Sequence, residues 1–82
     1  MDLKDMITDG LGETFLTSLQ RAIKDGYINI IGNEGKRKII YVASNNHTEN
    51  YEDPEEMVRA EFYAELIYKY EYPVNKDLYY RI

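Results

Sequence analysis

The chain contains no cysteine, no tryptophan and a single histidine, His47. Without cysteine it can form neither a disulfide nor a thiolate metal site, which is typical of proteins in the reducing cytoplasm. It also lacks the roughly 20 consecutive apolar residues of a membrane span and the apolar core of a signal peptide. These absences predict a soluble, cytoplasmic protein without a membrane partner.

Positive charge is also scarce, because 10 lysines and arginines face 15 aspartates and glutamates, for a net charge of −5. A dedicated non-specific DNA-binding protein would present a basic face, so this class is disfavoured. The one concentrated group of cations is Lys36, Arg37 and Lys38. A solvated turn is the simpler interpretation of this group, and contact with nucleic acid within a larger assembly is the alternative.

Tyrosine, by contrast, is abundant, with nine residues, five of which lie between positions 68 and 80. Tyrosine is an amphipathic contact residue that serves in protein interfaces and in base stacking. Packing at the edges of a small core is the simpler interpretation. The length predicts one small domain over residues 1–82.

The clearest local signal is a helix over residues 54–70. Asp53 is a suitable N-cap and Pro54 suits the first helical position. Glu56 stands three residues after Asp53, which is the spacing of a capping box. Pro73 disfavours helix in the residue before it and closes the segment.

The apolar residues of this helix fill one broad arc of the helical wheel, with Val58 at its edge. The members of the arc are Met57, Ala60, Phe62, Tyr63, Ala64, Leu66, Ile67 and Tyr70. Arg59 falls inside the arc, where a charge must be paired or reach solvent. An ion pair with Glu55, one turn earlier, is the simplest solution. Contact with a partner or a phosphate is the alternative, which makes Arg59 a candidate nucleic-acid contact.

The remaining segments predict an α+β fold, with two main helices packed on one face of a small antiparallel sheet. The expected elements are a short N-terminal helix within residues 1–12, a helix over 13–25 ended by Gly26, a hairpin over 27–44, a polar loop over 44–52 and a strand over 78–82. His47 is expected to be an exposed loop side chain. The hairpin and the C-terminal strand would form the sheet, and the free edge of that strand would favour either a homodimer or pairing with the remainder of a longer chain.

A group of residues on and around the 54–70 helix resembles the N-terminal region of type I restriction enzyme restriction (R) subunits and related PD-(D/E)xK nuclease N-terminal domains. The matching residues are Asp53, Pro54, Glu55, Glu56, Val58, Arg59, Glu61, Leu66, Ile67, Tyr72 and Pro73. This resemblance implies that the chain is the N-terminal portion of a restriction subunit. Its partners would be the remainder of that subunit or the methylation and specificity subunits, with DNA contacted indirectly.

The resemblance also implies a Mg²⁺-dependent DNA endonuclease as the full-length enzyme, in which an aspartate and a Glu-x-Lys hold the metal. Glu61 is the candidate accessory carboxylate and metal ligand, with Glu56 second. The chain departs from the family here, because no Asp…Glu-x-Lys follows Pro73. We therefore expect no catalytic residues and no cofactor in this chain. The alternative is a free-standing acidic protein-interaction module, such as a DNA mimic or an anti-restriction protein.

Overall fold

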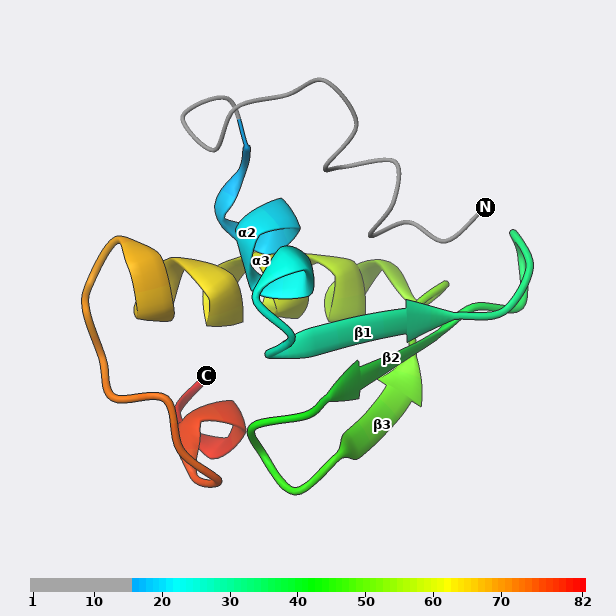
Figure 1. The fold of residues 1–82 in the computed structure, drawn as a ribbon. Coiled ribbons are helices and arrows are strands. Elements are labelled where there is room, and N and C mark those ends of the chain that lie inside the picture. The colour runs from blue at the N-terminus through cyan, green and yellow to red at the C-terminus, as the bar shows by residue number, and fades with distance from the viewer. Residues whose placement is uncertain (1–15) are drawn as a thin grey trace.

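The computed structural model describes residues 16–82, and the predicted N-terminal helix lies outside the described residues. The described part is an α+β domain with two α-helices and a three-stranded antiparallel sheet (Figure 1). In chain order the elements are α2 (Ser18–Lys24), β1 (Ile28–Ile31), β2 (Lys38–Tyr41), β3 (His47–Asn50), α3 (Pro54–Tyr68) and the 3-10 helix η2 (Leu78–Arg81). The predicted fold class is confirmed.

The predicted hairpin is formed by β1 and β2, in a register that places Ile30 opposite Ile39 and Ile28 opposite Tyr41. All four of these side chains are buried. The turn between the strands depends on Gly32, whose φ is +99°. A Cβ at this position would stand 3.0 Å from the backbone oxygen of Lys36, so the tight turn requires glycine.

The third strand is β3, which the sequence predicts as part of a polar loop. β3 pairs with β2, so that His47 lies opposite Tyr41 and the strand order is β1-β2-β3. The loop before it reverses the chain through Asn45 and Asn46, whose φ angles are 57° and 56°. Asparagine tolerates this left-handed conformation better than most residues. Backbone pairing with β2 holds this strand in place. Its side chains are exposed or half-buried, so polar residues are tolerated there.

Both helices begin at side-chain caps. The Asp53 side chain accepts a hydrogen bond from the amide N of Glu55 (3.0 Å), and Pro54 opens α3, as predicted. α2 begins later than predicted, at Ser18, directly after its N-cap residue Thr17. The Thr17 side chain and that of Gln20 form a capping box, which fixes the helix start at this point.

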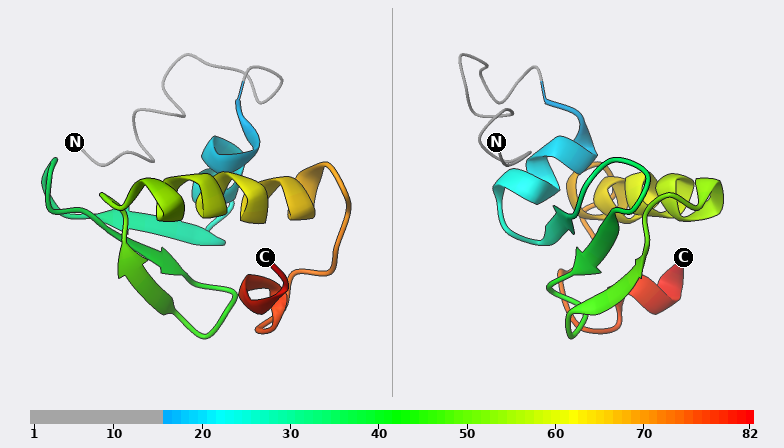
Figure 2. Two further views of the ribbon diagram at one scale, coloured as in Figure 1. Left: turned by 180° about the vertical axis from the view of Figure 1, so that it is seen from behind. Right: turned by 90° about the vertical axis from the view of Figure 1, so that its right-hand side faces the viewer.

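One hydrophobic core joins the helices and the sheet. α3 lies across one face of the sheet, and α2 packs against both α3 and β1 (Figures 1 and 2). The core residues are Ala22, Ile23, Ile28, Ile30, Ile39, Tyr41, Ala60, Tyr63, Ala64, Leu66, Leu78 and Tyr79. The small residues Ala60 and Ala64 let α3 approach its neighbours closely.

The predicted C-terminal strand is wrong, because this segment forms the 3-10 helix η2. The adjacent residues Leu78 and Tyr79 are both buried, whereas an edge strand with one exposed face would bury only one of them. The turn begins at Asn75, whose side chain accepts from the amide N of Asp77 and whose carbonyl accepts from that of Leu78. The strand edge that suggested a homodimer is therefore not there.

No helix within residues 16–82 combines the length and the apolar character that crossing a bilayer requires.

Candidate functional site

The first candidate site is a polar cluster of Tyr41, Glu56, Arg59 and Tyr79, beneath the first turns of α3. Tyr41, Glu56 and Tyr79 are buried, whereas the Arg59 side chain is 41% exposed. The Tyr41 hydroxyl donates to Glu56 Oε2 at 2.6 Å, and Arg59 Nη1 donates to Glu56 Oε1 at 3.1 Å. This arrangement corrects two predictions. Arg59 pairs with Glu56 rather than Glu55, and Glu56 points into the core instead of back to the backbone of Asp53.

Tyr79 brings η2 into the same cluster. Its hydroxyl accepts from Arg59 Nη1 at 3.1 Å and lies 3.4 Å from Glu56 Oε1. Burial raises the pKa of Tyr41, and the hydrogen bond with Glu56 raises that pKa further. Burial also raises the pKa of Tyr79. Both phenols therefore remain protonated at neutral pH, so neither of them acts as a base there.

Aromatic rings continue the cluster toward β3. The ring of Tyr79 lies 4.7 Å from that of Tyr41 and 4.1 Å from that of His47, measured between centroids. The prediction of an exposed loop histidine is therefore wrong, because His47 belongs to β3 and stacks on a buried tyrosine. His47 Nε2 lies 2.8 Å from Glu49 Oε1. Every buried side-chain nitrogen or oxygen in residues 16–82 has a hydrogen-bond partner. The cluster therefore joins β2, α3 and η2 through hydrogen bonds, and the ring contact of His47 adds β3.

The predicted basic turn is only partly available to a ligand. Arg37 donates through Nε (2.8 Å) and Nη2 (3.1 Å) to the carboxylate of Glu52, which also accepts from the amide N of Gly35. Arg37 is thereby held against its own chain. Lys36 and Lys38 are exposed. The assignment of the three cations to nucleic acid stays a prediction.

The contacts of Glu52 give a pH-dependent prediction. The side-chain hydrogen bonds from Arg37, followed by the backbone bond from its amide, lower the pKa of Glu52 to about 2. A carboxylate with a lowered folded-state pKa stabilises the fold above its unfolded pKa, and this contribution disappears as the pH falls through the folded pKa. We expect the Glu52 carboxyl carbon to titrate near pH 2 in an NMR pH titration. Between pH 4.5 and 2, the free energy of unfolding should fall less steeply in the Glu52→Gln variant than in the parent chain. Titration of Glu52 near pH 4.5 would contradict this structure of the turn.

The structure separates the two predicted accessory carboxylates. Glu56 is buried in the polar cluster, whereas Glu61 is exposed on another side of α3. No group of three or more histidine, aspartate or glutamate side chains within residues 16–82 converges as a metal site would. Glu56 and Glu61 therefore do not converge on a common Mg²⁺ ion in this structure. The Mg²⁺ requirement that the resemblance implies stays a prediction.

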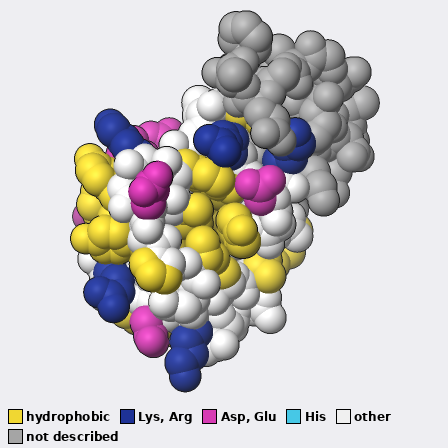
Figure 3. Space-filling model, turned by 60° about the vertical axis from the view of Figure 1, so that its left-hand side comes forward, with side chains coloured by type: hydrophobic (Ala, Val, Ile, Leu, Met, Phe, Trp, Pro, Cys, Tyr) yellow, Lys and Arg dark blue, Asp and Glu magenta, His cyan; other side chains and the backbone are white. Residues whose placement is uncertain are grey.

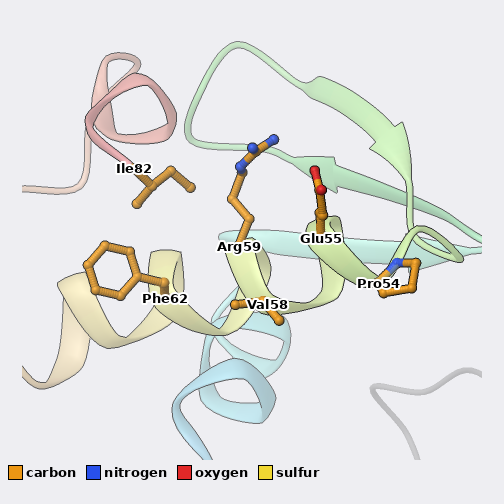
Figure 4. A pocket seen from close by; sticks show the side chains of 6 residues that line it. All are labelled: Pro54, Glu55, Val58, Arg59, Phe62 and Ile82. Atoms are coloured by element: carbon orange, nitrogen blue, oxygen red, sulfur yellow. The ribbon is translucent and has the colours of Figure 1, made fainter.

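The second candidate site is a shallow groove of about 550 Å³ on the outer face of α3. It is lined by Pro54, Glu55, Val58, Arg59, Phe62 and Ile82. Five of these residues come from α3, and Ile82 reaches toward them from the end of η2 (Figure 4). The side chain of Val58 is 71% exposed and that of Phe62 is 43% exposed. Hydrophobic side chains also gather between charged ones on the face shown in Figure 3.

No protein-family model matches the chain, and neither a curated protein nor a solved structure is significantly similar to it. The resemblance to type I restriction subunits therefore stays a prediction.

Sequence reasoning missed both the burial of Glu56 among the tyrosines and the groove. The predicted apolar arc of α3 includes Phe62, which the fold leaves at the surface, and omits Glu56, which the fold buries. One signal was present in the sequence. Val58 lies at the edge of the apolar arc, one turn before Phe62, and an arc broader than one buried face indicates a second contact surface.

Proposed function

We propose that this domain is a protein-interaction module, whose α3 groove receives an amphipathic helix of a partner. The observation that carries the proposal is the exposure of Val58 and Phe62 on the outer face of a helix that already has a buried face. Single exposed apolar residues are ordinary, but a contiguous row beside a hollow is typical of an interaction surface. The polar cluster supports the proposal indirectly. Its side chains already bond to one another, so its role is to stabilise the fold, and the groove is the site that faces a partner.

A helix fits the groove because of the spacing of its lining. Pro54, Val58 and Phe62 are each four residues apart and form one row along α3, about 12 Å long at 1.5 Å per residue. Such rows interdigitate with the corresponding rows of a second helix. The matching partner helix carries apolar residues at i, i+4 and i+8, a cation facing Glu55 and an anion facing Arg59.

The restriction-type function is retained as a proposal about the identity of the partner. Under that proposal the chain is the N-terminal portion of a restriction subunit, and its partners are the remainder of that subunit or the methylation and specificity subunits. Support for it comes from the residues of the resemblance, among them Val58 and Arg59, which line the groove.

Photo-crosslinking tests the proposed module. A p-benzoylphenylalanine replaces Phe62 in the full chain, expressed in cells, and the crosslinked peptide of the partner is sequenced by mass spectrometry. We expect one discrete adduct, whose mapped segment is an amphipathic helix with apolar residues four apart. Val58→Asp in the labelled chain should abolish the adduct, because it places a charge in the apolar row.

The matched control places the same label at Thr48, an exposed position on β3. This chain should give less than a tenth of the adduct. Circular dichroism of Val58→Asp should match that of the parent, since the replaced side chain is mostly exposed. Equal adducts from positions 48 and 62, or an adduct that persists with Val58→Asp, would overturn the proposed module.

A further inference from the structure

We infer that the helix in the groove is α3 of a second copy of this chain, in an antiparallel pair whose two-fold axis passes beside Val58. This inference rests on the proposed function and names the partner. An isologous dimer requires a self-complementary surface, on which each residue meets a residue that also meets it. The lining of the groove has this property in both its apolar and its charged positions.

The apolar positions are symmetric about Val58. In an antiparallel pair centred there, Val58 faces Val58 of the second copy, and Pro54 faces Phe62 in both directions, because each lies four residues from the centre. A large aromatic ring is thereby placed opposite a compact proline ring. Both helices contribute rows of residues four apart, which is the packing class with an interaxial angle of about −50°.

The charged positions are complementary under the same two-fold operation. Glu55 and Arg59 point to the same side of α3 (Figure 4). Glu55 of each copy therefore comes near Arg59 of the other copy, which gives two equivalent ion pairs. Arg59 uses only Nη1 in the polar cluster, and within residues 16–82 neither its Nε nor its Nη2 makes a hydrogen bond. These donors can therefore bind a second carboxylate without breaking the first ion pair. A partner of uniform charge would leave one of the two residues unmatched.

The groove is small, so the dimer is expected to be weak. Stable interfaces bury well over 1,000 Å², about 800 Å² per partner, whereas a contact of roughly two helical turns on each side buries less. The net charge of −5 on each copy further opposes association at low salt. The dimer should thus be sought over a concentration range of about 10 µM to 1 mM, characteristic of transient contacts.

Disulfide formation at a single introduced cysteine locates the two-fold axis. The chain has no cysteine of its own, so no other disulfide can form. At the crossing point of two helices packed about 8–10 Å apart, with Cα atoms about 2.3 Å from each axis, facing Cα atoms are about 3.4–5.4 Å apart. That range overlaps the separation of about 4.4–6.8 Å that a disulfide needs. We expect Val58→Cys in the full chain to form a covalent dimer under mild oxidation at least tenfold faster than Glu61→Cys. Equal rates would overturn the inference.

Sedimentation equilibrium of the disulfide-free chain tests the charges. We expect Glu55→Arg to weaken self-association about tenfold and added salt to strengthen the association of this variant, because two arginines then face each other. Glu61→Arg makes the same change in net charge outside the groove and should leave the dissociation constant unchanged within about twofold. An equal effect of the two substitutions would overturn the inference.

The two proposals fail separately. A photo-adduct at position 62 with a different protein, together with equal oxidation rates for Val58→Cys and Glu61→Cys, overturns the second copy and leaves the interaction module standing. A monomer at every concentration that also gives no adduct at position 62 overturns both.

Discussion

Replacing Glu56 by alanine should lower the free energy of unfolding by about 2–4 kcal/mol, because the buried Tyr41 hydroxyl loses its acceptor and a cavity is left behind. The substitution leaves the Tyr41 hydroxyl without its acceptor at 2.6 Å and Arg59 without its carboxyl partner, in a space that Glu56 filled. An 82-residue domain has a total stability on the order of 8 kcal/mol, so this loss is a large fraction of it. Urea denaturation followed by circular dichroism measures the change.

Glu61→Ala is the matched control, because Glu61 is an exposed glutamate on the same helix. Its effect should stay within about 0.5 kcal/mol. If Glu56→Ala does not fold, Glu56→Gln keeps the size and one acceptor and should cost less, about 1–3 kcal/mol. A cost of Glu56→Ala no larger than that of Glu61→Ala would show that the buried cluster is not formed.

Tyr79→Ala should also destabilise the domain by about 3–5 kcal/mol, as large aromatic truncations in cores do. The ring of Tyr79 is 8% exposed and packs between those of Tyr41 and His47, so its removal leaves a cavity where η2 meets the sheet. Its neighbour Tyr80 is 68% exposed. Tyr80→Ala should cost at most about 1 kcal/mol, the worth of its edge contact with the Tyr79 ring.

This pair of adjacent tyrosines tests which of the two rings η2 places in the core. Denaturant midpoints of the two variants, compared with that of Tyr79→Phe, measure the ring and the hydroxyl separately. Tyr79→Phe should cost about 1–2 kcal/mol, because it removes only the bonds with Arg59 and Glu56. A larger loss for Tyr80→Ala than for Tyr79→Ala would place the wrong tyrosine in the core and contradict the position of η2.

The elements that the sequence predicted well are those specified by neighbouring residues. The start of α3 follows from Asp53 and Pro54, whose cap and fixed φ act within one turn. Gly26 ends α2 with a φ of +84°, as its position after the helix indicates. The β1–β2 hairpin follows from two β-branched runs separated by glycines. In each case the decisive interactions span only a few residues, so the sequence contains them.

Other features depended on residues far apart in the chain. Residues 44–52 have the composition of a polar loop, and only pairing with β2 turns residues 47–50 into a strand. The segment at η2 has strand-like composition, yet Tyr79 is drawn into a cluster with Arg59 and Glu56, and Ser44 Oγ accepts from its amide N at 3.3 Å.

The candidate sites also combine features set by neighbouring residues with features set by tertiary packing. The sequence by itself determined that α3 forms, that its apolar arc is broad and that Arg59 needs a partner. Only the tertiary structure decided that this partner is Glu56 and that Val58 and Phe62 stay outside the core. The physical reason is that a small sheet and one short helix cover only one side of α3. Which apolar residues are buried therefore depends on where the neighbouring elements pack, and local periodicity does not contain that information.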